Sequence, residues 1–109
     1  MKLVMAVVQD KDSNQLQATL VDEGFQVTKL ASTGGFLRSG NTTFMIGTVD
    51  TRVDELLEII HDQCKSRKQV VSPMSSLDGS AEGYMLHPVK VEVGGATIFV
   101  LDVDRFEHF

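Results

Sequence analysis

Residues 3–8 constrain the fold more than any other part of the chain, because every one of them is apolar. Successive residues of a β-strand point to opposite faces of the sheet, so a strand that is apolar throughout needs cover on both faces. Neighbouring segments show a different pattern. Residues 25–31 mix apolar and polar side chains, which alternate over 25–28, as in a strand with one face towards the core. Residues 3–8 therefore predict a central strand.

Two helices are predicted from apolar residues at helical spacing. The first follows residues 9–13, which are rich in residues that favour a helix start, and Gly24 ends it. The apolar residues that mark the two helices are Leu16, Leu20 and Val21 in the first, and Val53, Leu56, Leu57 and Ile60 in the second.

Further strands are predicted at residues 42–49, 89–93 and 96–103, with Gly94 and Gly95 as a two-residue hairpin turn between the last two. Residues 69–88 follow neither period and predict a long mobile loop. The resulting β-α-β-β-α-β order with one extra strand is typical of a ferredoxin-like split β-α-β sandwich of the α+β class. We expect a single domain over residues 1–109, with an antiparallel sheet and two helices on one face.

Two helices cover only one face of such a sheet. Leu3, Met5 and Val7 alternate with Val4, Ala6 and Val8, and both sets are apolar. The set that does not face the helices needs another cover, and a second subunit is the simplest one. The sequence thus predicts a closed oligomer.

The charge balance excludes some classes of partner. The chain has 15 acidic and 10 basic residues, for a formal net charge of -5. An acidic surface does not attract DNA, RNA or anionic membranes, because cations that neutralise phosphates are in deficit. Cys64 is the single cysteine and cannot form an internal disulfide, so we expect a cytoplasmic protein.

Residues that could support catalysis or hold a metal are sparse. His61 and Cys64 are three positions apart and could form a nucleophilic pair, or could simply be one solvated residue and one packed residue. His61, His87 and His108 are too widely spaced for a metal site. Glycine motifs for nucleotide hydrolysis or dinucleotide redox chemistry are absent from the sequence. We therefore expect no enzymatic activity, no metal and no cofactor.

Residues 28–47 carry the strongest indication of a binding site. Gly34 and Gly35 would let a ligand approach the backbone, and the Phe36 ring could stack on a flat heterocycle. The Asn41 amide offers both a donor and an acceptor for a base edge or a ribose. The alternative is an ordinary glycine-rich turn, with Phe36 packed in the core or against another subunit.

The same residues resemble the PII-like cyclic-di-AMP receptor family (PstA/DarA type). The segments that carry the resemblance are 1–10, 27–31, 33–37, 39–47 and 91–97. The resemblance covers essentially the whole chain, and the block at 33–47 is the most specific part of it.

The resemblance implies a homotrimer that binds one cyclic di-AMP in each of three clefts between subunits, and that signals to an unidentified protein target. Thr28 and Asn41 would bond the base or ribose. The segment Gly35, Phe36 and Leu37 would hold an adenine, and the Gly47 backbone would touch the ligand. Residues 69–88 would then order on binding and contact the target.

Two positions depart from the family pattern. Position 26 is commonly Arg but is Gln26 here, and position 108 is commonly Gln but is His108 here. Gln26 removes a charge near a dianionic ligand, whereas His108 could restore a donor that depends on pH. Two other functions therefore stay open: a PII-like adaptor that senses another adenine nucleotide, and a small enzyme acting on nucleotides.

Overall fold

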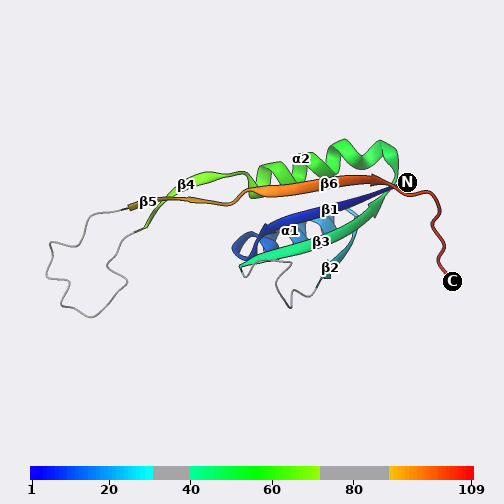
Figure 1. The fold of residues 1–109 in the computed structure, drawn as a ribbon, viewed down its shortest axis with the longest axis horizontal. Coiled ribbons are helices and arrows are strands. Elements are labelled where there is room, and N and C mark those ends of the chain that lie inside the picture. Colours follow the sequence, from blue (N-terminus) through cyan, green and yellow to red (C-terminus); the bar gives the residue numbers. More distant parts are fainter. Residues whose placement is uncertain (31–39, 72–88) are drawn as a thin grey trace, which may run out of the picture.

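The structure, a computed structural model, describes residues 1–30, 40–71 and 89–109 (Figure 1). Its elements follow in the order β1 (Lys2–Gln9), α1 (Asp10–Asp22), β2 (Gln26–Leu30), β3 (Asn41–Thr48), the short 3-10 helix η1 (Asp50–Arg52), α2 (Val53–Cys64), β4 (Arg67–Val71), β5 (Val89–Val93) and β6 (Ala96–Asp102). The elements β1, α1, β2, β3, α2 and β6 form the predicted β-α-β-β-α-β unit. The α+β ferredoxin-like fold predicted from the sequence is confirmed.

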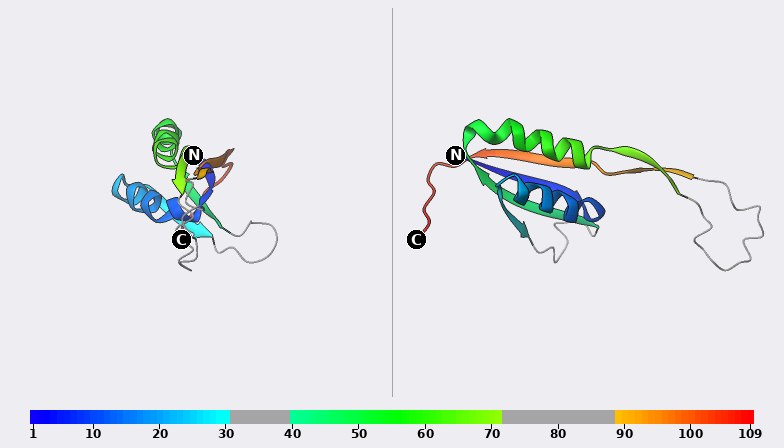
Figure 2. Two further views of the ribbon diagram at one scale, coloured as in Figure 1. Left: turned by 90° about the vertical axis from the view of Figure 1, so that its left-hand side faces the viewer. Right: turned by 180° about the vertical axis from the view of Figure 1, so that it is seen from behind.

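The main sheet has four strands in the order β2-β3-β1-β6, and each neighbouring pair is antiparallel. Strand β1 is therefore an inner strand, as its apolar sequence predicts. Both helices lie on the same side of this sheet, which is clearest in the end-on view of Figure 2. On the other side no helix occurs among the described residues.

The core lies between the sheet and the helices. Alternate residues of β1, namely Val4, Ala6 and Val8, are buried there against Leu16, Leu20, Leu56 and Ile60 of the helices. Val21 was predicted to share this face but is 58% exposed. It follows Leu20 directly, and one step along a helix turns a side chain by about 100° away from the core.

Helix α1 ends where Gly24 predicts, and the hydrogen bonds explain why. Phe25 N donates to Leu20 O at 2.9 Å, and Gly24 N donates to Val21 O at 3.0 Å. This pair of bonds is a Schellman motif, which requires a left-handed residue just after the helix. Gly24 has a φ of +86° and meets that requirement without strain.

The side of the sheet away from the helices is called the open face. Register and alternation place on it Gln26, Thr28, Asn41, Met45, Gly47, Leu3, Met5, Val7, Phe99 and Leu101. Leu3, Met5 and Val7 are half-buried, and Phe99 is 56% exposed. The open face is thus a largely apolar surface with polar groups gathered along β2 and β3.

Strands β4 and β5 form a separate two-stranded ribbon, called the arm, that runs beyond the main sheet (Figure 1). The prediction of a hairpin between residues 89–93 and 96–103 is wrong, because β5 pairs with β4 and β6 pairs with β1. Gly94 and Gly95 have φ values of +86° and +95° and join the two strands without folding one back on the other. A Cβ on Gly94 would lie 2.6 Å from Lys65 O, so only glycine fits here.

Residues 69–71, predicted as the start of the loop at residues 69–88, belong to strand β4. Residues 72–88 lie outside the described part of the chain. Neither α1 nor α2 nor any other described helix has the length and apolar character needed to cross a membrane.

Candidate functional site

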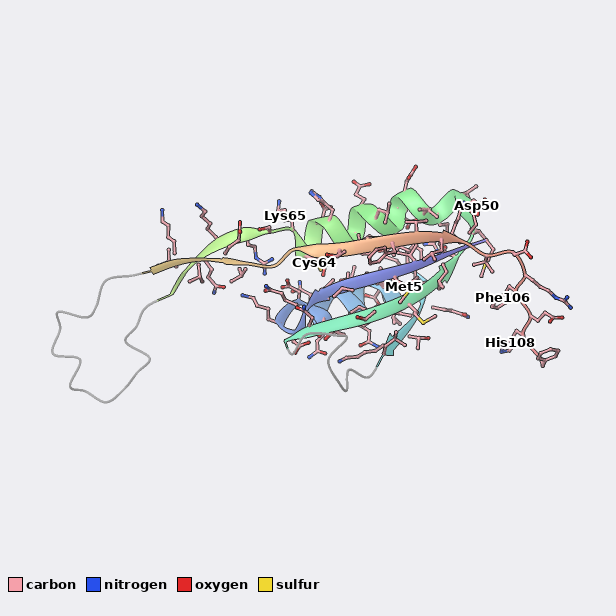
Figure 3. All side chains as sticks on the ribbon, in the orientation of Figure 1. Met5, Asp50, Cys64, Lys65, Phe106 and His108 are labelled. Atoms are coloured by element: carbon pink, nitrogen blue, oxygen red, sulfur yellow. The ribbon has the colours of Figure 1, made fainter. Side chains whose placement is uncertain are left out.

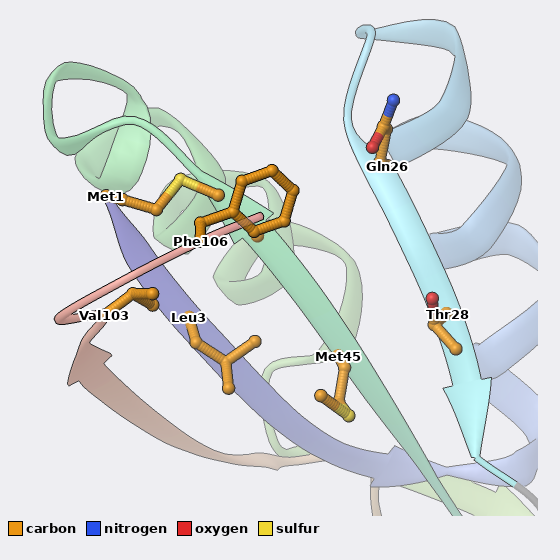
Figure 4. A pocket seen from close by; sticks show the side chains of 8 residues that line it. Met1, Leu3, Gln26, Thr28, Met45, Val103 and Phe106 are labelled. Atoms are coloured by element: carbon orange, nitrogen blue, oxygen red, sulfur yellow. The ribbon is translucent and has the colours of Figure 1, made fainter. Parts of the chain in front are cut away.

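The open face contains a hollow of about 330 Å³ near the start of β1 (Figure 4). It is called the open-face hollow, and its lining residues are Met1, Leu3, Gln26, Thr28, Met45, Gly47, Val103 and Phe106. Gln26, Thr28 and Gly47 were singled out from the sequence as ligand-binding residues. The pairing of β2 with β3 places Gln26 opposite Gly47 and Thr28 opposite Met45, which brings them to one side of the sheet.

The polar groups in the hollow are available to a ligand. Gln26 and Thr28 are exposed, and neither side chain has a hydrogen-bond partner among the described residues. Gly47 leaves the backbone of β3 accessible opposite Gln26. A Cβ at this position would meet only the Met1 methyl, at 3.3 Å, so no packed neighbour requires the glycine. The backbone at Gly47 is therefore open to close approach from the hollow.

Phe106 is a site residue that the sequence reasoning did not assign. Its ring is 63% exposed and lies beside Met1 on the wall of the hollow (Figure 4). Val103 N donates to Met1 O at 3.2 Å, which holds the start of the C-terminal segment against β1. The available signal was an aromatic residue shortly after the last strand, but no periodicity indicated where its ring would lie.

Asn41 lies on the open face but not in this hollow. It is the first residue of β3 rather than part of the preceding loop, and Gly47 is six residues further on. Because an antiparallel strand rises about 3.4 Å per residue, the two positions are about 20 Å apart. Asn41 instead lines a second hollow of about 370 Å³ together with Gln9, Gly94 and Thr97.

The remaining predicted residues are not brought together by the described structure. His108 is exposed on the C-terminal segment beyond the sheet and lines neither hollow (Figure 3). Gly35, Phe36 and Leu37 lie outside the described residues, in the segment between β2 and Gly40.

The side chains that line the open-face hollow carry no formal charge. Charges occur at the nearby end of the sheet, but they are paired: Lys2 with Asp102, and the N-terminal ammonium with Asp50 at 2.8 Å. The bond to Asp102 raises the pKa of Lys2, and the bond to the ammonium lowers the pKa of Asp50. A dianionic ligand in the hollow would therefore be held by dipoles and apolar contact, with Gln26 in place of the arginine common in the family.

The structure favours the packing interpretation of Cys64 over the nucleophilic one. Cys64 is fully buried, and burial raises the pKa of its thiol to about 11. The His61 side chain is 72% exposed and contacts Asp62. A nucleophile must be ionised and accessible, and Cys64 is neither. No group of residues able to hold a metal occurs within the described ranges.

Known proteins match this chain over its whole length. The family model for the cyclic-di-AMP receptor matches residues 1–109. A solved structure of a protein of unknown function from Pediococcus pentosaceus ATCC 25745 is 49% identical, with a TM-score of 0.79 over 99% of this chain and 96% of that one. The match over the full length shows that this chain belongs to the cyclic-di-AMP receptor family.

Proposed function

We propose that the protein is a receptor for cyclic di-AMP that acts without catalysis, as a homotrimer with one ligand in each of three clefts between subunits. The observation that carries the proposal is the gathering of Gln26, Thr28 and Gly47 around one hollow on the face that no helix covers. This hollow has the apolar walls and few polar groups that are typical of small-molecule sites.

The separation of Asn41 from Gly47 supports a cleft that two subunits share. About 20 Å of strand lies between them, so one protomer cannot easily apply both to one part of a small ligand. If the Asn41 end of one open face meets the Gly47 end of its neighbour, the two sets of groups converge. Such an arrangement also covers the half-exposed apolar residues of β1.

Binding is then relayed to an unidentified protein target through residues 69–88, of which only Gln69, Val70 and Val71 lie in the described arm. A ligand shifts the loop equilibrium only by its differential affinity for the two loop states. Limited proteolysis tests this relay: cyclic di-AMP should slow cleavage within residues 69–88, and equal cleavage with and without ligand would contradict it.

Calorimetry with cyclic di-AMP, cyclic di-GMP, ATP and AMP tests the ligand assignment. We expect one cyclic di-AMP per subunit, with the other nucleotides at least about tenfold weaker. Cyclic di-GMP presents a different base edge, and ATP and AMP each carry one adenine and would leave the groups that bond the second one unpaired. Light scattering should give three times the 12.0 kDa protomer mass. Tighter ATP binding would favour the adaptor for another adenine nucleotide, and turnover of any of these nucleotides would favour an enzyme.

Asn41→Ala tests one residue of the proposed site in the same calorimetry experiment. We expect weaker cyclic di-AMP binding by about 0.5–1.5 kcal/mol, the usual net value of one neutral hydrogen bond. Asn14→Ala is the matched control, because Asn14 is exposed on α1 on the other side of the sheet. Equal affinities of the two variants would remove Asn41 from the site.

A further inference from the structure

The turn that joins β1 to α1 contacts both the beginning of β3 and the base of the arm. It consists of residues 9–12 and is called the β1–α1 junction. Towards β3, Asp10 N donates to Gly40 O at 2.8 Å, and the Thr42 hydroxyl donates to the Asp10 carboxylate. These two bonds hold the residues on either side of Asn41. The junction therefore positions the backbone from which the Asn41 side chain extends.

The same short segment also holds the arm. Gly94 N donates to Gln9 Oε1 at 2.8 Å, directly after β5. On β4, the Arg67 guanidinium donates to Asp12 Oδ1 at 2.9 Å, and Lys11 Nζ donates to Gln69 Oε1 at 2.8 Å. Both strands of the arm are thus tied, at their base, to the turn that positions Asn41.

The bond between Asp12 and Arg67 is the strongest of these ties. The Asp12 side chain is only 8% exposed, whereas that of Arg67 is 39% exposed. The second carboxylate oxygen of Asp12 is buried and has no partner among the described residues. Separating Arg67 from Asp12 would leave a buried carboxylate without its cation, which is costly. Movement of the arm base is therefore expected to move the junction with it.

We infer that the β1–α1 junction is a positioning element that couples Asn41 to the arm. A ligand that fixes Asn41 steadies the arm base, and a partner that fixes the arm changes ligand affinity at Asn41 by the same factor. The inference rests on the proposed function for its ligand but not for the coupling itself, which exists in the free protein. Exchange and binding measurements on variants at the two ends of the junction measure this coupling directly.

Hydrogen exchange of the full chain without ligand tests the coupling. Thr42→Val removes the hydroxyl that bonds Asp10 while it keeps the side-chain shape. We expect exchange at the arm base, in residues 67–71 and 94–95, to rise by about 2- to 30-fold. Thr48→Val is the matched control, because Thr48 is a buried threonine on the same strand and the same face, far from the junction. An arm base that exchanges alike in both variants would overturn the inference.

The reciprocal test changes Arg67, a residue outside the ligand site, to Gln. Calorimetry then measures the affinity of this variant for cyclic di-AMP. We expect affinity to fall by the same range of about 2- to 30-fold. Gln69→Ala, which removes the acceptor of the bond from Lys11 to β4, serves if Arg67→Gln does not fold. Failure of the wild-type protein to bind would contradict the proposed function, while the exchange experiment would still decide the coupling. Unchanged affinity in folded Arg67→Gln, or in the Gln69→Ala variant that replaces it, would contradict the coupling.

Discussion

The two faces of the main sheet are built from the same strands but differ in how deeply their side chains are buried. On the helix side, Val4, Ala6, Phe44 and Ile46 are fully buried. On the open face, Leu3, Met5, Val7 and Met45 are half-buried and Gly47 is exposed, although Thr43 is buried. The Gln26 and Thr28 side chains there have no hydrogen-bond partner among the described residues. The comparison indicates that one face supplies the free energy of folding, and that the other is left free to bind.

The largest expected difference between the faces comes from adjacent residues of β3. Phe44→Ala should reduce the free energy of unfolding by about 3–5 kcal/mol, because it leaves a cavity in the core. Met45→Ala, one residue further on the open face, should cost about 1 kcal/mol, since less apolar area is lost from a half-exposed side chain. Urea unfolding at one protein concentration measures both, and equal losses would contradict the division between the faces.

Cyclic di-AMP binding should depend on residues of the open-face hollow more than on residues of the core. Phe106→Ala should weaken cyclic di-AMP binding by about 1–3 kcal/mol, the usual value of one base stacked on an aromatic ring. Its ring is 63% exposed, so stability should change little. Calorimetry and urea unfolding of the same variant separate the two effects. Phe109→Ala is the control, because Phe109 is a fully exposed phenylalanine near the same chain end but lines no part of the hollow.

A smaller change in affinity is expected when a charge is added to the uncharged open-face hollow. Gln26→Arg should strengthen cyclic di-AMP binding by about 1 kcal/mol, because a charge-assisted bond to phosphate exceeds a neutral one by roughly that amount. Binding should also become more sensitive to salt. Gln26→Lys adds the charge without the planar fork and should gain less. Weaker binding by Gln26→Arg would place the phosphates elsewhere.

The last expected effect distinguishes the faces by pH. Burial on the helix side raises the pKa of Cys64 from 9.0 to about 11. The unfolded chain therefore loses this proton from about pH 9 upward while the folded protein keeps it. The contribution to stability is complete below pH 9 and is lost as the pH rises towards 11. Cys64→Ala should show a shallower fall in urea stability over that range, and an equal fall would contradict the assignment.

Much of the fold could be predicted because burial leaves a period in the sequence. The apolar run in β1 and the spacing of Leu56 and Ile60 in α2 both reflect the core. Strand β4 was missed because it pairs with β5 outside that core, where no such period is needed. Gly94 and Gly95 suit a hairpin turn equally well, and only contacts with distant groups, Gln9 Oε1 and Cys64 O, decide otherwise.

The site was predictable in part for a similar reason. Alternation along β2 and β3 explains why Gln26, Thr28 and Gly47 share one face. The position of Phe106 depends on how the C-terminal segment folds back on β1, which local sequence does not indicate. The contacts of the β1–α1 junction likewise join residues far apart in the chain, so their convergence was visible only in three dimensions.

Methyl NMR during titration with cyclic di-AMP shows which face of the main sheet binds the ligand, because methyl groups report on one face at a time. If the ligand binds the open face, signals from Leu3, Met45 and Val103 should shift first and most. Signals from the helix side, those of Val4, Ile46 and Leu56, should shift little. If the largest shifts occurred on the helix side, or none occurred on the open face at saturation, the open face would not be the ligand-binding face.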